Sequence, residues 1–314
     1  MQHILILCPL YNDEASFNIF AAQIEKEIAN AGHQKFSFLI INDGTDQLQL
    51  STALPITIVH LHRNIGHQKA IAIGLAYAHH NLSFDGIVIM DCDGEDKPAD
   101  IFYLLSKSIE NNAIVVAKRA SRQEGRSFQL FYALYKIMFY VLTGKRISFG
   151  NFMAMPKKEV DKIVHYSEIW NHLAGAIIKS KLPYHYISSH RGKRYTGNSK
   201  MNFTGLLLHG LGAIGVFVEI IASRLLMLSL LMISLSIFAI LIIVFIKFFT
   251  NNAIPGWATN TVSSMLIVLL QSFLLSLFTI FLYLTFQGQR KFIPSYHYKD
   301  YVRSVENKND GQQL

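Results

Sequence analysis

Charge and cysteine are scarce in this 314-residue chain. Only 16% of the residues are charged, and there are two cysteines and seven prolines. Cys8 and Cys92 each follow an apolar run and lack the spacing of a zinc site, so we expect reduced thiols and no disulfide scaffold. The 29 basic residues outnumber the 21 acidic ones, which gives a net charge of +8. The basic residues are not interleaved with aromatic residues as in base-stacking surfaces, so we expect no nucleic-acid partner.

Charge almost disappears over two stretches in the C-terminal third. Leu225 to Phe249 contains only Lys247, and Val262 to Phe286 contains no charged residue. Each stretch has 25 residues, more than the roughly 20 that a helix needs to cross a bilayer. A buried core helix is the weaker alternative at this length. We therefore predict a two-helix transmembrane domain over 225–286 and a lipid bilayer as a partner.

Basic residues flank this predicted hairpin on its outer sides. Arg224 precedes it, and Arg290 and Lys291 follow it, whereas the loop between the spans has no Lys or Arg of its own. Because Lys and Arg near spans favour the cytoplasmic side, we predict a multi-pass protein of the inner (plasma) membrane with both termini in the cytoplasm.

Two further segments adjoin the spans. The apolar residues 201–224 predict an amphipathic helix lying on the membrane surface, with a third, shorter span as the alternative. Residues 287–314 predict a cytoplasmic tail, loosely ordered from Tyr296 onward.

Residues 1–200 alternate between strand-like and helix-like patterns, which predicts one α/β domain. Short apolar runs predict strands at 4–8, 36–41, 56–61, 86–90, 113–117 and 148–155. Helices are predicted at 14–30, 67–80, 98–110, 127–142, 156–165 and 168–180. Such alternation favours a mostly parallel, Rossmann-like sheet with helices on both faces.

The fourth predicted strand ends abruptly in an acidic turn. Ile87 to Met90 is apolar, and Asp91-Cys92-Asp93-Gly94-Glu95-Asp96 follows directly. Ligands of open α/β sheets bind just beyond the carboxyl ends of the strands. Carboxylate oxygens in an Asp-x-Asp pair suit Mg²⁺ or Mn²⁺, which share the phosphates of a substrate. A solvated acidic turn is the alternative for this motif taken alone.

Three other strand ends also carry polar motifs. They are Pro9-Leu10-Tyr11-Asn12-Asp13-Glu14, Asn42-Asp43-Gly44-Thr45 and Arg63-Asn64-Ile65-Gly66-His67-Gln68-Lys69. Because parallel strands end at the same edge of a sheet, the four motifs predict one pocket. The Asp43 carboxylate can accept hydrogen bonds from a base N–H or from ribose hydroxyls. The histidines, His67 among them, are expected to be structural or solvent-facing, because their spacing gives no metal motif.

These motifs resemble those of family 2 glycosyltransferases of the GT-A fold. The resemblance is greatest to the polyprenyl-phosphate glycosyltransferase branch, which includes dolichyl-phosphate mannose synthase and bacterial undecaprenyl-phosphate sugar transferases. The family's Pro-x-Tyr-Asn-Glu, Asp-Asp-Gly-Ser and Asp-Ala-Asp-Leu-Gln-Asp are similar to the first, second and acidic motifs here. An Arg-x-x-Gly-x-Ser-Lys segment is similar to Arg194-Tyr195-Thr196-Gly197-Asn198-Ser199-Lys200. The resemblance extends to about residue 290 and makes 1–200 a cytoplasmic catalytic domain.

The resemblance implies an inverting enzyme that moves a sugar from a nucleotide-diphosphate sugar, UDP- or GDP-linked, to polyprenyl (undecaprenyl) phosphate. It implies Mg²⁺ or Mn²⁺ bound by Asp91, Asp93 and Glu95, with Asp93, Arg119 and Arg194 as catalytic residues. The implied donor-binding residues are Pro9, Tyr11, Asn12, Glu14, Asp43, Gly66, Lys69 and Asp91. The implied acceptor-phosphate residues are Arg119, Arg122, Arg126, Arg194, Ser199 and Lys200. One guanidinium group can donate two parallel hydrogen bonds to the oxygens of a phosphate.

Three residues depart from the family pattern. Asn42 replaces an acidic residue, Glu95 stands where the family often has Gln, and Asn151 replaces the Asp of a Gly-Asp-Phe-Arg segment. Where that Asp acts as a base, its loss would impair attack by a sugar hydroxyl. A lipid phosphate has a second pKa near 6 and is already largely anionic, so Asn151 favours either a phosphate acceptor or an altered or inactive enzyme.

Two alternatives remain open at this point. One is a glycosyltransferase that acts on a glycan or glycolipid hydroxyl, and the other is a catalytically impaired homologue that binds lipid or partners. The sequence names neither the sugar nor the polyprenol, and it leaves a homo-oligomer open.

Overall fold

The computed structural model describes residues 2–29, 34–46, 48–119, 126–197, 203–249 and 256–308. They divide into two compact units. The sheet unit comprises residues 1–138, 145–216 and 291–314, and the hairpin unit comprises residues 139–144 and 217–290.

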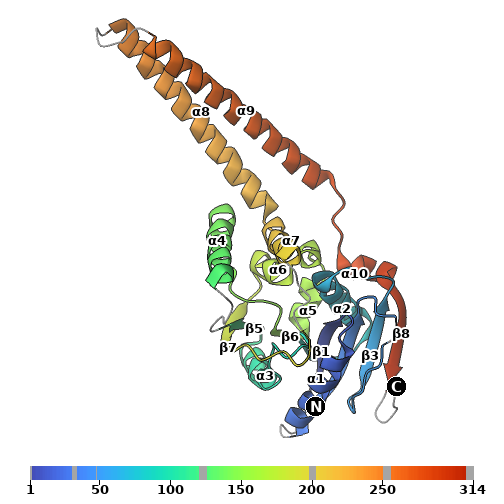
Figure 1. Cartoon of the computed structure of the whole chain (residues 1–314). Coiled ribbons are helices and arrows are strands. Elements are labelled where there is room, and N and C mark those ends of the chain that lie inside the picture. Colours follow the sequence, from blue (N-terminus) through green and yellow to red (C-terminus); the bar gives the residue numbers. More distant parts are fainter. Residues whose placement is uncertain are drawn as a thin grey trace. The chain divides into compact units, whose positions relative to one another are not determined.

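An eight-stranded mixed sheet forms the centre of the sheet unit, in the order β7-β5-β6-β4-β1-β2-β3-β8 (Figure 1). The strands are β1 (His3–Leu10), β2 (Lys35–Asn42), β3 (Ile56–Leu61), β4 (Gly86–Ile89), β5 (Ile114–Arg119), β6 (Met153–Pro156), β7 (Tyr184–Ser189) and β8 (Val302–Lys308). β4, β1, β2 and β3 are parallel neighbours, whereas β6 and β8 pair antiparallel with the strands beside them. The predicted α/β architecture is confirmed, with a parallel centre and antiparallel additions.

Helices cover both faces of the sheet, because each face carries its own apolar cluster. α2 (His67–Asn81), α5 (Lys157–Ile163) and α6 (Leu173–Ser180) pack on one face. α1 (Glu14–Ala29) and α3 (Asp100–Asn111) pack on the other. The remaining short elements of this unit are η1 (Ser167–Trp170), α7 (Phe203–Gly215), α10 (Pro294–His297) and η2 (Tyr298–Tyr301). α4 (Arg126–Thr143) begins in this unit and ends in the hairpin unit.

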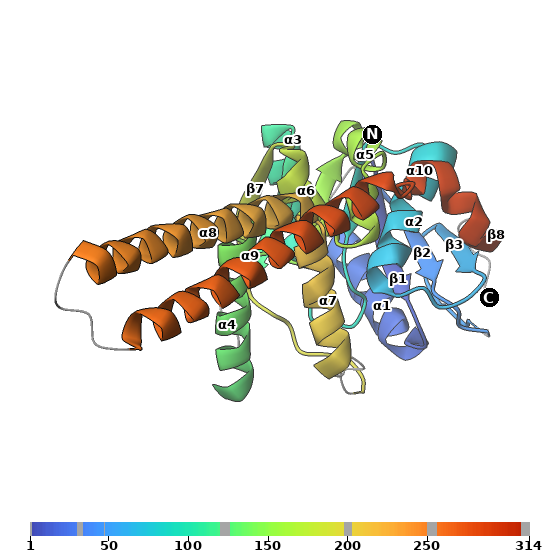
Figure 2. The same cartoon turned by 90° about the horizontal axis from the view of Figure 1, so that it is seen from above.

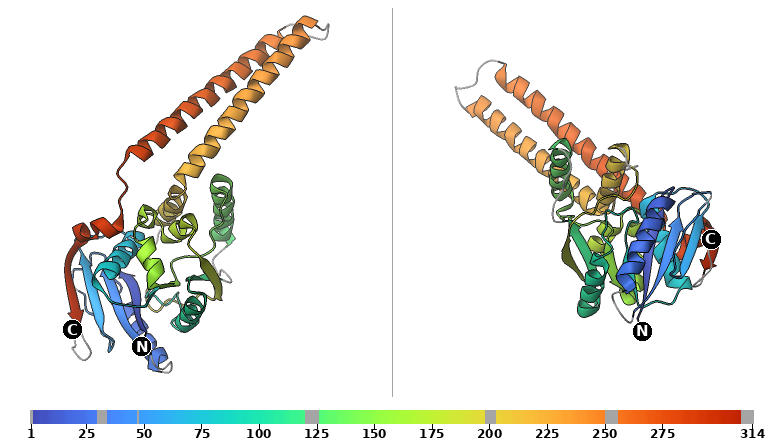
Figure 3. Two further views of the ribbon diagram at one scale, coloured as in Figure 1. Left: turned by 180° about the vertical axis from the view of Figure 1, so that it is seen from behind. Right: turned by 60° about the horizontal axis from the view of Figure 1, so that its bottom comes forward.

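The C-terminal segment differs from the prediction. A loosely ordered tail from Tyr296 is wrong for residues up to Lys308, because α10, η2 and β8 are regular elements of the sheet unit. β8 pairs antiparallel with β3, opposing Ile56 to Lys308 and His60 to Ser304. Figures 1 and 3 both show β8, in dark red, beside the pale-blue β3. The segment after the hairpin therefore completes the edge of the sheet.

The hairpin unit consists mainly of two long antiparallel helices, which lie side by side in Figures 1 and 2. α8 (Val218–Phe249) and α9 (Trp257–Gly288) have mean hydropathies of 3.0 and 2.5 over their most apolar windows, and both are long and apolar enough to cross a membrane. Ser229 Oγ lies 2.6 Å from Ser276 Oγ at the contact between them. The helices extend beyond the predicted spans, and the predicted surface helix 201–224 is α7 followed by the start of α8.

Candidate active site

The acidic turn after β4 is held by its own backbone. Asp96 Oδ2 accepts the N–H of Asp91 at 3.1 Å, and Asp93 Oδ1 accepts the N–H of Glu95 at 2.9 Å. Asp96 is buried, and its carboxylate stabilises the turn. The remaining oxygens of Asp91 and Asp93 stay at the carboxyl edge of the parallel strands.

Residues 190–197, which follow β7, lie across this turn. The N–H of Gly192 donates to Glu95 O, and the N–H of Tyr195 donates to Asp93 O, both at 2.9 Å. A Cβ on Gly192 would collide with Gly94 O, so only glycine permits this close approach. The backbone contact thereby fixes where the basic residues of 190–197 meet the acidic turn.

Arg194 connects two strand ends. Its Nη1 lies 3.3 Å from Asp93 Oδ2, and its Nη2 donates to Asp13 Oδ2 at 3.2 Å. Arg191 forms a similar pair with Glu95. Burial raises the pKa of the Asp93 carboxyl, while the Glu95 N–H and the Arg194 charge oppose that rise. The arrangement concentrates three carboxylates and two guanidinium groups in a partly buried place, where ionic contacts are stronger than in water.

Asp43 ties the second motif to the third. Its Oδ1 accepts the N–H of Ile65 at 2.7 Å, and its Oδ2 accepts the N–H of Gly66 at 3.0 Å. Burial raises the pKa of Asp43, although both backbone N–H groups stabilise its charged form. Gly44 has φ +93°, and a Cβ there would lie 2.6 Å from Asn64 N, so the two loops touch through this glycine. Asp43 is thus engaged in shaping the loop 63–66.

The first motif leads from β1 into α1. Pro9 lies within β1, Tyr11 is exposed, and Glu14 is in the first turn of α1, where a carboxylate complements the helix dipole. Asn12 adopts the left-handed conformation, with φ 49°, which Asn tolerates better than most residues. Its N–H donates to Thr45 Oγ1 at 2.9 Å, which joins the ends of β1 and β2.

Asn151 is held next to the acidic turn by a chain of amides. Gln68 Oε1 accepts the N–H of Leu173 at 2.9 Å, so its Nε2 faces and donates to Asn151 Oδ1 at 3.0 Å. Asn151 Nδ2 then lies 3.0 Å from His67 Nε2, which in turn is 3.2 Å from Asp91 Oδ1. Burial lowers the pKa of His67 to about 4, so the imidazole is neutral near pH 7. His67, expected to be structural or solvent-facing, thus lies between Asn151 and the acidic turn.

The Glycosyl transferase family 2 profile matches residues 6–163, about half of the chain, and these residues carry the four strand-end motifs. The chain belongs to glycosyl transferase family 2. It is 26% identical over 274 residues to the glycosyltransferase YkcC of Bacillus subtilis, covering 83% of this chain and 82% of that protein. It is 28% identical to the undecaprenyl-phosphate 4-deoxy-4-formamido-L-arabinose transferase of Yersinia enterocolitica, over 49% of this chain and 48% of that one.

Among solved structures, glucosyl-3-phosphoglycerate synthase of Mycobacterium tuberculosis, crystallised with Mn²⁺ and UDP-glucose, matches with a TM-score of 0.48. The identity is 12%, and the match covers 70% of this chain and 79% of that one.

The basic residues implied by the family resemblance are only partly described. Arg119 ends β5 and Arg126 begins α4, but their side chains lie outside the described residues, as do Arg122, Ser199 and Lys200 altogether. Lys69 Nζ lies 5.2 Å from the centre of the Trp170 ring, and its charge stabilises the ionised form of Asp43. Among the expected acceptor-phosphate residues whose side chains the structure describes, Arg194 alone lies at the acidic turn.

The acidic turn offers a divalent cation two carboxylates, which is fewer ligands than a complete metal site needs. Within the described residues, no group of three or more His, Cys, Asp and Glu side chains converges on one point. Asp91 and Asp93 offer hard oxygens on one turn, whereas Glu95 is taken by Arg191. Two carboxylates completed by diphosphate oxygens and water make a coordination that Mg²⁺ accepts. The residues present therefore fit the ion, with Glu95 as a ligand only if its pair with Arg191 opens.

Two contributors to the site were not predicted from the sequence. Asp13 and Gln68 stand inside the quoted motifs, but nothing in the motifs says that Asp13 meets Arg194 or that Gln68 holds Asn151. Arg191, which pairs with Glu95, is a third contributor that the motifs do not predict. The sequence carries no local signal for these contacts, because β7, which brings residues 190–197 to the acidic edge, has no clear strand pattern.

Proposed function

We propose that this family 2 chain is a membrane-bound inverting glycosyltransferase. It transfers a sugar from a UDP- or GDP-linked donor to polyprenyl phosphate on the cytoplasmic face of the inner (plasma) membrane. The observation that carries the proposal is the Arg194 guanidinium held between Asp13 and Asp93 at the strand ends, beside a position where Asn151 offers no carboxylate base.

The donor would occupy the edge where four strands end. Asn12, Asp43 and Gly66 already form one connected surface through Thr45 and the backbone of residues 65–66. Asp91 and Asp93 would hold Mg²⁺ or Mn²⁺, and the ion, when bound, neutralises the diphosphate and stabilises it as a leaving group. Arg194 is close enough to Asp93 to exchange this carboxylate for a phosphate oxygen when a substrate arrives.

Transfer would occur as one displacement. An acceptor phosphate oxygen forms a bond to the anomeric carbon, the bond from that carbon to the diphosphate oxygen breaks, and the diphosphate leaves with the electron pair. No proton has to be removed from an ionised phosphate, so Asn151 can stand where a hydroxyl acceptor would need a base. Arg194 would hold the incoming negative charge near a leaving group of the same sign.

The membrane arrangement is supported by the pairing of β8 with β3. The two strands belong to one unit, yet α8 and α9 lie between them in the sequence. If both helices cross the bilayer, the residues before and after them must be on the same side. The positive residues flanking the hairpin favour the cytoplasm for that side.

The test is an acceptor comparison with the purified full-length chain in lipid nanodiscs. A panel of UDP- and GDP-sugars with Mg²⁺ or Mn²⁺ is offered to polyprenyl phosphate, free polyprenol and oligosaccharides, and lipid products are identified by mass spectrometry. We expect a glycosyl phosphate ester of the polyprenol and no product from free polyprenol. Transfer to an oligosaccharide but not to polyprenyl phosphate would refute the acceptor. No transfer to any acceptor would favour a binding homologue.

A further inference from the structure

Asn42, one of the departures from the family pattern, lies buried at the end of β2. Its Oδ1 accepts the N–H of Thr45 at 2.8 Å, and its Nδ2 donates to Thr45 O at 2.8 Å. Because a backbone N–H only donates and a carbonyl only accepts, these two bonds fix the orientation of the side-chain amide. Asn42 thereby closes the turn that presents Asp43 and Thr45.

The fixed amide determines the tautomer of His60. His60 lies directly opposite Asn42 in the β2–β3 ladder, and its Nδ1 is 2.9 Å from Asn42 Nδ2. Since Nδ2 can only donate, Nδ1 of His60 must accept, and a neutral ring then carries its proton on Nε2. His60 is only 6% exposed, and burial lowers its pKa, which agrees with a neutral ring.

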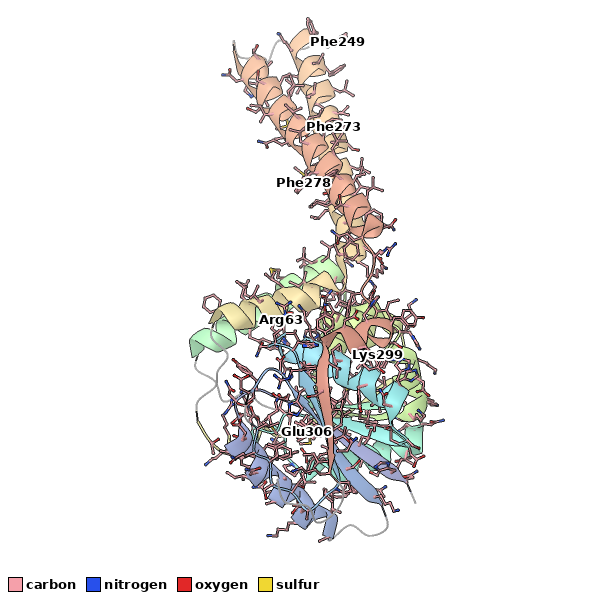
Figure 4. The ribbon with its side chains drawn as sticks, turned by 90° about the vertical axis from the view of Figure 1, so that its right-hand side faces the viewer. Arg63, Phe249, Phe273, Phe278, Lys299 and Glu306 are labelled. Carbon is pink, nitrogen blue, oxygen red and sulfur yellow. The ribbon has the colours of Figure 1, made fainter. Side chains whose placement is uncertain are left out.

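The protonated nitrogen faces β8. His60 Nε2 lies 3.2 Å from Glu306 Oε1, although the N–H direction departs from the line between the atoms. Glu306 sits opposite Ile58 in the β3–β8 ladder, one diagonal step from His60, and Figure 4 labels it on this strand. Its side chain is 51% exposed, so the contact is an electrostatic one that solvent partly screens.

We propose that Glu306, His60 and Asn42 form a positioning chain through which β8 holds the turn 42–45 in its donor-binding shape. The chain continues from Thr45 Oγ1 to the N–H of Asn12, so it reaches the ends of β1 and β2. None of the three residues acts on the reacting atoms. The inference rests on the proposed function only where it assigns the turn to donor binding. The contacts between Glu306, His60 and Asn42 do not depend on that assignment.

The positioning chain requires a neutral His60 ring. A doubly protonated ring would bring an N–H at Nδ1 against the Asn42 amide, which also donates there. Two charged groups of β8 bear on the ring, since Glu306 favours protonation and Arg303 opposes it, and Asn42 faces it from β2. Acidification should therefore loosen the turn before it unfolds the sheet.

Three variants test the chain in full-length protein in nanodiscs. Glu306→Ala removes the contact, Glu306→Gln keeps an acceptor without charge, and Asn307→Ala is the matched control. Asn307 accepts a hydrogen bond from Thr57 Oγ1 at 2.9 Å, so it ties the same two strands without reaching Asn42. Hydrogen exchange of residues 42–46 and the Kd values for UDP and GDP with Mn²⁺ are measured at pH 7.

We expect Glu306→Ala to speed exchange in 42–46 and to weaken nucleotide binding by about two- to fivefold, the range of a partly exposed ionic contact. Glu306→Gln should restore part of this loss, and Asn307→Ala should change neither quantity. Equal behaviour of Glu306→Ala and Asn307→Ala would overturn the proposal. If neither nucleotide binds the wild-type protein, the proposed function fails. Hydrogen exchange of residues 42–46 still decides in that case whether the positioning chain exists.

The tautomer provides a second measurement that needs no variant to fold. Nitrogen NMR of ¹⁵N-histidine-labelled protein should find the His60 proton on Nε2, and a proton on Nδ1 at pH 7 would overturn the assignment. Asn42→Asp replaces the donating amide by an acceptor, so His60 should then be protonated on both nitrogens and titrate at a higher pH. An unchanged His60 titration in Asn42→Asp would also contradict the proposal.

Discussion

Arg194 Nη1 lies 3.3 Å from Asp93 Oδ2, while the other terminal nitrogen of the same guanidinium reaches Asp13. Carboxylates from the ends of two strands are thereby held by one side chain of a third segment. Without substrate, this residue offsets the repulsion among the acids. We propose that, with a diphosphate and a cation in place, the same group would become available to a phosphate.

Replacing Arg194 should therefore affect transfer more than folding. Arg194→Ala removes two charge-assisted contacts of roughly 1.5–3 kcal/mol each. Losing one of them in the transition state corresponds to a tenfold to hundredfold slower reaction. We expect a lower kcat or a higher KM for polyprenyl phosphate, with a smaller change for the donor. Arg194→Lys should recover little activity, because an ammonium cannot span both carboxylates. A rate for Arg194→Ala within twofold of the wild type would contradict this role.

Asp93 should be indispensable for transfer. Asp93→Ala removes one of two expected metal-binding carboxylates, so we expect activity to fall below detection and EDTA to reproduce the loss in the wild type. Asp91→Ala should also weaken nucleotide binding. Glu110→Ala is a suitable control, because Glu110 is exposed on α3 and pairs only with Lys107 among the contacts described for it. Full turnover of the wild type in EDTA would refute the metal requirement.

His172 should make the protein sensitive to acid. Burial lowers its pKa to about 3, and its neutral Nδ1 accepts the N–H of Gly175 at the start of α6. A folded-state pKa below the unfolded value means that the unfolded chain binds more protons, so stability is full above about pH 6.5 and falls as the pH decreases toward 3. Between pH 6.5 and 5 the loss from this group is about 1–2 kcal/mol.

His172→Asn should reduce that sensitivity, because Asn is a good N-cap and does not titrate. The measurement is the difference in apparent unfolding temperature between pH 7.5 and pH 5, compared with the same difference for the wild type. The exposed His185, changed to Asn, serves as the control. Equal acid sensitivity of His172→Asn and the wild type would show that other groups dominate.

Topology can be read from thiol labelling, since Cys8 and Cys92 are both buried. Thr259→Cys places a thiol in the first turn of α9, and Ser304→Cys places one on β8. An impermeant maleimide should label Thr259→Cys only from the outer side of sealed vesicles and Ser304→Cys only from the inner side. Labelling of both positions from the same side would exclude the hairpin.

Much of the sheet could be predicted because local patterns and final packing agree. The buried parallel strands β1 to β4 are short, mostly apolar runs that end in polar motifs, so their length and composition locate them within a few residues. The polar motifs at their ends then follow from the common edge of a parallel sheet. The family profile and the observed strand order are consistent with that inference.

The two strands that were missed have no such local signal. β7 (Tyr184–Ser189) begins with the half-buried Tyr184 and the exposed His185 and Tyr186, and β8 resembles a polar tail because most of its residues are exposed. Each is a strand because it pairs with a strand far away in the sequence, β5 for β7 and β3 for β8. A short stretch of sequence does not reveal such a partner. The pairing of Glu95 with Arg191 was missed for the same reason, since composition does not say which opposite charges meet.

The position of β8 also sets an order of events during synthesis. Strand β3 leaves the ribosome early, but the residues that cover its outer edge are among the last of the described chain. Both long apolar helices emerge in between. For that interval the nascent protein presents an open strand edge, the kind of surface on which β-sheets of different chains join. If the helices insert into a membrane, slow insertion would lengthen this exposure, and the need for chaperones during translation should rise.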